Sequence, residues 1–409
     1  MQNAIIIVIC SLLLLAYLFD ISSAFTKIPS VILLLILGMI VKWTTSFLSI
    51  RMPDLNPVLP ILGTLGLILI VLEGSLELEL NKSKTEIIKK SFLVSLIPIL
   101  VIAVVLALVF KFHQDVTYRS AFINALPFCV ISSAIAIPSV RNLLSSDREF
   151  VIYESSLSDI LGVLIFNFIM VNEIINVASF GFFGLEILII IIISFFSVLG
   201  LSFLLSRIEH HITYTPIILL IILIYGITKV YHLPGLVFIM VFGLFLGNFS
   251  SFKRFSWIEK FRPEKLEKEV EKFKGITIEA TFLVRALFFL LFGFLIDPKE
   301  IINMDSLPWS AGIVALILGV RYITLKVFRL PVYPLQFIAP RGLITILLFV
   351  SILPELSIPV VNNSLIIQTV LLSVLVMMLG LINSPASPIG STLSSVRHDK
   401  ESDNEDIVT

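Results

Sequence analysis

Two acidic residues and three serines interrupt an otherwise apolar stretch of chain at residues 153–171. Ser155 and Asp159 are four residues apart, and Glu154 and Ser158 form a second pair with the same spacing. On an α-helix, residues four apart lie on one face, so the two pairs form neighbouring stripes. A charge inside a membrane costs about 3 kcal/mol or more, and such acids are usually functional. The pattern predicts that one stripe presents oxygen atoms to a cation while the other faces a positively charged side chain.

The composition shows what kind of chain surrounds these residues. The chain has 409 residues, of which 57% are hydrophobic and only 14% are charged. A soluble protein carries about 25% charged residues. Apolar runs of membrane-spanning length recur from end to end, so we expect an all-α, multi-pass protein of the cell (inner) membrane, with the lipid bilayer as a partner and no nucleic acid. Cys10 and Cys129 both lie in apolar runs and indicate neither a disulfide nor a metal framework.

The apolar runs predict about thirteen membrane-spanning segments. An odd number places the two termini on opposite sides, and Lys and Arg are concentrated in the connections on the side of the C-terminus. The positive-inside rule then predicts an outside N-terminus and a cytoplasmic C-terminus. The polar residues 391–409 are predicted to be a disordered cytoplasmic tail. The predicted segments lie near residues 4–19, 28–42, 57–74, 92–110, 120–140, 152–172, 182–205, 212–229, 233–248, 277–296, 308–328, 333–352 and 363–383.

The predicted segment at residues 120–140 contains helix-breaking residues. Pro127 and Pro138 flank the pair Ser132 and Ser133. Each proline removes a backbone donor, and unwound backbone at membrane depth is tolerated only where protein or water satisfies it. Broken helices of this kind mark ion sites in secondary transporters. The alternative is a kinked packing helix whose serines bond to their own carbonyls, and Pro138 fits that alternative.

A second interruption places Pro340, Arg341 and Gly342 in succession within the predicted segment 333–352. These two interrupted segments are the fifth and the twelfth predicted segments, so they have opposite orientations in the membrane. Two interrupted helices in corresponding halves of an inverted repeat point to a site near the bilayer midplane. The residues alone do not establish the repeat, because the two halves share little sequence similarity.

Three further charged residues in predicted spans are candidates for a role in the site. Arg321 lies too deep for its guanidinium to reach the membrane surface, so it needs a carboxylate, and Glu154 is the obvious candidate. The pair could be a structural one that fixes helix register. Arg285 could line a cytoplasmic access path or bind the carbonyls of a broken helix. Glu73 could be an interfacial carboxylate or an acid that reaches the ion path.

Taken together, these residues resemble the monovalent cation:proton antiporter superfamily, and most of all the sodium/proton exchangers of bacteria and archaea. The stretch Glu154–Asp159 is similar to the Glu-Ser-x-x-Asn-Asp motif of that family. By this resemblance, Asp159 matches the ion- and proton-binding aspartate, Ser155 matches a serine that can ligate the ion, and Glu154 matches the acid that pairs with an arginine, here Arg321.

Further stretches carry the same resemblance along the chain. Arg341-Gly342 resembles the Arg-Gly that opens a later broken helix, and Glu73-Gly74 resembles a Phe-Glu-Gly/Ala stretch. Arg285 with the phenylalanines after it resembles an Arg-x-Phe-Phe-Phe stretch. The chain departs from the exchangers at Ser158, where they usually have Asn, and at Ser132-Ser133-Ala134, where they have Thr-Asp-Pro. The second departure is more similar to the potassium-efflux branch of the superfamily.

The resemblance implies a fold with two parts. Residues 1–390 would form one polytopic antiporter domain. Within it, an inverted repeat with two crossed broken helices would form a core at about residues 91–172 and 308–383. A scaffold at about residues 1–74 and 182–296 would carry the contacts of a homodimer. The protein would be a transporter and not an enzyme.

The resemblance also implies how the site works. Asp159 would bind a proton or one Na⁺, K⁺ or Li⁺ in turn, with further oxygens from Ser155, Glu73, Ser132 and Ser133. No cofactor is expected apart from the transported cation. The implied function is Na⁺/H⁺ exchange, and the alternatives are K⁺/H⁺ efflux exchange or a cation channel or uniporter that is not coupled to protons.

The charge count at the site favours one stoichiometry. If Arg321 neutralises Glu154, a single titrating acid remains, and this predicts a one-for-one, electroneutral exchange. A second unpaired acid would instead make the cycle sensitive to voltage, by about 2.3 kcal/mol per charge per 100 mV.

Overall fold

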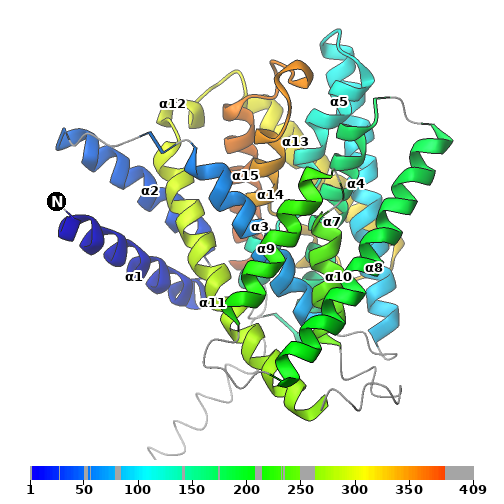
Figure 1. Ribbon diagram of the computed structural model, residues 1–409. Helices are drawn as coiled ribbons and strands as arrows, with labels where there is room; N and C mark the ends of the chain where they lie inside the picture. The colour runs from blue at the N-terminus through cyan, green and yellow to red at the C-terminus, as the bar shows by residue number, and fades with distance from the viewer. Residues whose placement is uncertain are drawn as a thin grey trace, which may run out of the picture.

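The structure, a computed structural model, consists of α-helices and short 3₁₀ turns, and its described residues contain no strand (Figure 1). The predicted tail at residues 391–409 lies outside the described residues. The structure describes residues 2–26, 28–49, 54, 55, 57–78, 84–140, 143–173, 176–207, 214–231, 233, 235–248 and 263–382.

The helices follow the predicted apolar runs closely along the chain. Apolar side chains are tolerated on every face of a helix that lipid surrounds, so long helices form along the apolar runs. The elements are α1 (Gln2–Thr26), α2 (Ser30–Phe47), α3 (Val58–Glu77), α4 (Thr85–His113), α5 (Tyr118–Ala125), η2 (Leu126–Phe128), α6 (Ser133–Ser139), α7 (Ser145–Val171), α8 (Val177–Arg207), α9 (Thr215–Val230), α10 (Gly235–Gly247), α11 (Pro263–Leu295), α12 (Pro298–Ile301), α13 (Leu307–Val327), η5 (Leu335–Phe337), α14 (Leu343–Val350), η6 (Pro354–Leu356) and α15 (Asn363–Ile382).

Ten segments in the described part of the chain are long and apolar enough to cross a membrane, so the protein is a multi-pass membrane protein. Two shorter apolar helices lie at Ile217–Val230 and Gly235–Gly247. The remaining predicted span, residues 333–352, is not a continuous helix. Its helical part is confined to η5 and α14, because Pro340 between them cannot donate a backbone hydrogen bond. The total of thirteen spans stays a prediction.

The helices pack in two groups. In the first, α11 packs against α2 and α3, and α3 packs against α10. In the second, α4 packs against α5, α7 and α13, and α13 packs against α15. Figure 1 shows α1 and α2 at one edge of the molecule, with α14 and α15 nearer its centre. The helix α7 also contacts α3 and α10, so it lies where the two groups meet.

The α2–α11 pair is held together by close backbone approach. A Cβ atom added at Gly293 would lie 2.3 Å from the carbonyl oxygen of Leu35, and one added at Gly38 would lie 2.3 Å from that of Leu290. The Nζ atom of Lys42 lies 2.8 Å from the carbonyl oxygen of Ile296, at the C-terminal end of α11. Small residues allow such contacts between membrane helices, which gain packing energy from them.

We expect Gly293→Ala to lower the melting temperature of the purified protein in detergent. The added methyl group meets backbone, which cannot move aside as a side chain could, and overpacking of this kind costs about 1–3 kcal/mol. Gly312→Ala is the matched control, because nothing lies within 4 Å of a Cβ atom there. Equal melting temperatures for the two variants would contradict the packing described for α2 and α11.

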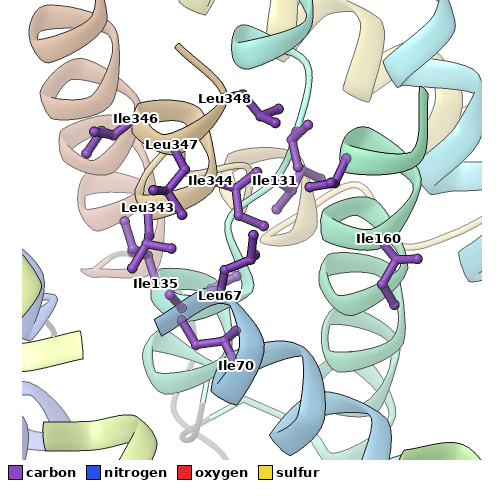
Figure 2. Packing of buried hydrophobic residues seen from close by; sticks show 14 of the residues in the cluster. Leu67, Ile70, Ile131, Ile135, Ile160, Leu343, Ile344, Ile346, Leu347 and Leu348 are labelled. Atoms are coloured by element: carbon purple, nitrogen blue, oxygen red, sulfur yellow. The ribbon is translucent and has the colours of Figure 1, made fainter. Parts of the chain in front are cut away.

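Buried apolar side chains from distant parts of the chain surround the two interruptions. Figure 2 shows Leu67 and Ile70 of α3 together with Ile135 of α6 and with Leu343 and Leu347 of α14. All five side chains are buried. Polar groups among them are therefore shielded from water, and electrostatic interactions there are stronger than at the surface.

Candidate ion-binding site

The two interruptions touch through their backbones. The first lies between η2 and α6, and the second lies between η5 and α14. The amide nitrogen of Ser132, in the first, donates to the carbonyl oxygen of Pro340, in the second, at 2.9 Å. A Cβ atom at Gly342 would lie 2.8 Å from the Ser132 hydroxyl oxygen and 2.5 Å from the Ile135 side chain. A glycine at 342 is therefore needed for this close approach.

The buried Arg341 side chain binds the carbonyls that the first interruption leaves open. Its Nε atom donates to the carbonyl oxygen of Phe128 at 2.6 Å, and Nη2 donates to that of Cys129 at 3.4 Å. Its Nη1 atom donates to the carbonyl oxygen of Ala339 at 3.1 Å, and its backbone amide donates to the Ser373 hydroxyl at 2.9 Å. The guanidinium thus satisfies backbone acceptors that would otherwise be buried without donors.

Asp159 of α7 lies beside the start of α6, with an exposed fraction of 2%. Its Oδ2 atom accepts a hydrogen bond from the Ser133 amide at 3.2 Å and another from the Ser133 hydroxyl. Within the described chain, its Oδ1 atom has no hydrogen-bond partner and Asp159 forms no ion pair. The buried hydroxyl oxygen of Ser132, next along the chain, likewise has no partner there.

These oxygens have the chemistry of a cation site. Buried polar atoms are nearly always hydrogen-bonded, so those that are not need an explanation. A carboxylate and neutral hydroxyl oxygens are the ligands that hard cations prefer. Among the described residues, no group of three or more His, Cys, Asp or Glu side chains could hold a metal ion. The arrangement offers one carboxylate oxygen and one hydroxyl oxygen that have no partner among the described residues.

The helix α7 also holds the unwound segment in place. The Ser158 hydroxyl accepts a hydrogen bond from the Ile131 amide at 2.9 Å. A Cβ atom at Gly162 would lie 2.1 Å from the Val130 side chain, so the segment and α7 are in close contact. Ser158 was predicted to be associated with the broken helix. It contacts the unwound segment through the backbone amide of Ile131.

Two of the predicted ion ligands do not contact Asp159. The Ser155 hydroxyl donates to the carbonyl oxygen of Val151 at 2.7 Å, within its own helix. Glu73 lies in the wall of a cavity of about 440 Å³, which Asp159 does not line. Ser133 does line this cavity, so it connects the cavity with the carboxylate.

Sequence reasoning missed two acids of the cavity wall. Asp20 of α1 and Glu279 of α11 both line it, with Glu73. A signal for Asp20 was present, because it is an acid at the end of a long apolar run. Glu279 lies inside the predicted segment 277–296, where an acid is likewise a signal of function.

Glu154 and Arg321 form a buried, bidentate ion pair. The two oxygen–nitrogen distances are 2.6 Å and 2.9 Å, and the Arg321 Nε atom donates to the Leu335 carbonyl oxygen at 2.6 Å. The exposed fractions of Glu154 and Arg321 are 1% and 2%. The planar guanidinium matches the carboxylate, and the pair joins α7 to α13.

Arg285 has features of both roles that its sequence position suggested. It lines the cavity, and its Nη1 atom lies 3.5 Å from the carbonyl oxygen of Ala134 in α6. Arg285 and Ser133 therefore belong to the same cavity wall, on α11 and on α6 respectively.

The comparisons with known proteins agree with this geometry. A family of transmembrane sodium/hydrogen exchangers matches residues 9–386, and the chain belongs to this family. It is a family of ion transporters, so the chain is a membrane transporter and not an enzyme. None of the curated proteins matches the chain.

Two solved structures of a sodium proton antiporter, MjNhaP1 from Methanocaldococcus jannaschii, share the fold. The structure at pH 8 is 17% identical, covers 93% of this chain and 96% of its own, and has a TM-score of 0.66. An electron-microscopy structure is 18% identical, covers 93% and 95%, and has a TM-score of 0.68. At this identity the likeness concerns the fold, which extends over nearly the whole chain.

Proposed function

We propose that this chain exchanges a monovalent cation for a proton and that Asp159 holds the two in turn. The observation that carries the proposal is the buried Asp159 carboxylate, which Ser133 bonds next to the point where the two backbone breaks touch. Among the described residues, one of its oxygens has no hydrogen-bond partner. Burial without a counter-charge favours a neutral state of this carboxyl, and either a bound proton or a bound cation supplies it.

Na⁺ is the cation that family membership favours. The ligands proposed around it are Asp159, the hydroxyls of Ser132 and Ser133, and water from the cavity. One observation supports K⁺ as a second candidate. Ser133 gives the break a neutral hydroxyl where exchangers have a carboxylate, and this resembles the potassium-efflux branch. A weaker negative field suits a larger and less strongly hydrated ion.

Access from both sides of the membrane is supported by a second cavity. It has a volume of about 420 Å³ and is lined by Ile346 and Phe349 of α14 and by Asp297 and Glu300 beyond the end of α11. The half-helix α6 lines the first cavity and α14 lines the second, so each broken segment faces one of them. We propose that the core moves past the scaffold and exposes Asp159 to each side alternately.

The exchange is proposed to be electroneutral. Of the two buried acids of α7, Glu154 is neutralised by Arg321, so Asp159 is the one that remains to exchange one proton for one cation. The contacts of a homodimer are proposed on the scaffold, with the N-terminus outside and the C-terminus in the cytoplasm.

Proteoliposomes that contain a pH-sensitive dye test the exchange directly. When NaCl, LiCl or KCl is added outside, we expect the interior to become more alkaline, because protons leave as the cation enters. The order of the responses gives the cation, and choline chloride and protein-free liposomes are the controls. An electroneutral exchanger responds equally with and without an imposed voltage. Cation flux without any pH change would indicate an uncoupled channel. The absence of a pH change with all three salts would exclude exchange.

A further inference from the structure

The short helix α6 contains a proline four residues after Ala134. In a regular α-helix, the amide of residue 138 would donate to the carbonyl oxygen of residue 134. Pro138 has no amide hydrogen, so this bond cannot form. The Ala134 carbonyl is thus left open within the helix. Its position matters, because Ala134 directly follows Ser133, whose amide and hydroxyl hold Asp159.

The donor that approaches this carbonyl comes from the other group of helices. Arg285 Nη1 lies 3.5 Å from the Ala134 oxygen. Arg285 belongs to α11, which packs against α2 and α3, whereas α6 packs mainly against α7. Ala134, Pro138 and Arg285 all line the 440 Å³ cavity. The contact therefore links the two groups of helices at the wall of the cavity, one residue away from the Asp159 partner.

We propose that Arg285 is a positioning residue, which binds the carbonyl that Pro138 leaves open and so stabilises the orientation in which this cavity leads to Asp159. The inference rests on the proposed exchange. If the core moves past the scaffold, a single hydrogen bond between α11 and α6 cannot persist in both orientations. The bond forms in the orientation seen here and adds to the stability of that orientation alone.

Loss of the hydrogen bond between Arg285 and Ala134 should change the cation KM in opposite directions on the two sides of the membrane. A direct effect of Arg285 on the ion would change both KM values in the same direction. The apparent dissociation constant equals the intrinsic one divided by the fraction of molecules in the competent orientation. The hydrogen bond between Arg285 and the Ala134 carbonyl, the latch, therefore changes the apparent constants on the two sides of the membrane in opposite directions. Loss of the latch raises the cation KM on the side of the cavity and lowers it on the other side. We expect the ratio of the two KM values to change about three- to tenfold, which corresponds to one net hydrogen bond.

Two single variants should have the same effect for different reasons. Arg285→Gln removes the cationic donor. Pro138→Ala restores an amide that bonds the Ala134 carbonyl within α6, and this bond competes with the arginine for the same oxygen and weakens the contact. The double variant should show no larger shift than Arg285→Gln alone, because both substitutions act on the same contact between Arg285 and the Ala134 carbonyl. Arg285→Lys, which keeps a cationic donor, should restore part of the ratio. Pro98→Ala, at a proline in the interior of α4, is the control and should leave the ratio unchanged.

The transport test uses the full-length protein in proteoliposomes of known orientation, with the cation KM measured from each side. Opposite shifts in Arg285→Gln and Pro138→Ala, not additive in the double variant, are the expected result. Shifts in the same direction on both sides would mean that Arg285 acts on the ion itself and would overturn the inference, as would additive shifts or none. If Arg285→Gln fails to fold, Pro138→Ala carries the test.

A second readout does not depend on transport. Ile137→Cys, in the wall of the cavity, is labelled with a membrane-impermeant maleimide in a Cys10→Ser background, since Cys129 is buried. Labelling should be slower once the latch is removed, by at most the same factor of about three to ten. Unchanged labelling would overturn the latch even if exchange is observed. A wild-type protein that does not exchange, but whose labelling slows in Arg285→Gln, would overturn the proposed function and leave the latch standing.

Discussion

Replacing Asp159 by Asn is expected to abolish proton-coupled cation exchange while the protein still folds. The amide has nearly the shape of the carboxyl group, so the Ser133 amide and hydroxyl can still bond its oxygen. It can neither release a proton nor offer a negative charge to a cation, and both halves of the cycle fail together. The dye assay in proteoliposomes should fall to the level of protein-free liposomes.

The matched control for this substitution lies on the same helix. Asp147 is in the first turn of α7 and away from the breaks, and Asp147→Asn should retain exchange. Size-exclusion profiles and melting temperatures of both variants should resemble the wild type. Exchange that persists in Asp159→Asn would show that another group carries the proton, and Glu73 in the cavity wall would then be the next residue to test.

The second large effect is expected at the buried ion pair. Glu154→Gln leaves the Arg321 guanidinium, with an exposed fraction of 2%, without its counter-charge. Breaking a buried pair from one side costs about 3–5 kcal/mol, whereas removing both charges costs far less. We therefore expect Glu154→Gln to lower the melting temperature strongly and the double variant Glu154→Gln/Arg321→Met to recover most of the loss.

The half-buried ion pair between Lys84 and Glu149 provides the control for the same substitution. Its side chains are 29% and 34% exposed, with a nitrogen–oxygen distance of 2.7 Å. Pairs that water reaches contribute about 0–1 kcal/mol. Glu149→Gln should therefore change the melting temperature little. A similar small change in Glu154→Gln, or a double variant no more stable than the single one, would contradict the structural role of the buried pair.

Several contacts of the site can be predicted from the sequence, because a charged or polar group deep in a membrane has few possible partners. A guanidinium as deep as that of Arg321 must meet a carboxylate, and Glu154 was an acid of suitable depth. The two clusters of helix-breaking residues likewise marked the segments that meet at Ser132 and Pro340. In both cases, the high cost of an unsatisfied polar group in lipid makes a local pattern informative about a distant partner.

Other features depend on contacts that a single sequence does not encode locally. Ser155, a candidate ligand by its helical spacing, instead donates to the Val151 carbonyl. A helical serine can satisfy its hydroxyl in this way at small cost, and spacing alone cannot exclude it. The sequence around Pro138 was compatible with a simple helix kink. In the structure, the proline leaves the Ala134 carbonyl open, and Arg285 of α11 approaches it. Arg341 could be assigned to a break but not to the carbonyls of Phe128 and Cys129, because these lie in the other break.

The central claim is that a proton and a cation occupy one carboxyl group by turns, and proton release on cation binding tests it most directly. Purified protein in weakly buffered detergent solution is titrated with NaCl, and with KCl if Na⁺ gives no signal, while a pH dye reports released protons. We predict close to one proton released per cation bound for the wild type and none for Asp159→Asn. Cation binding that releases no proton, or release that is unchanged in Asp159→Asn, would contradict the claim.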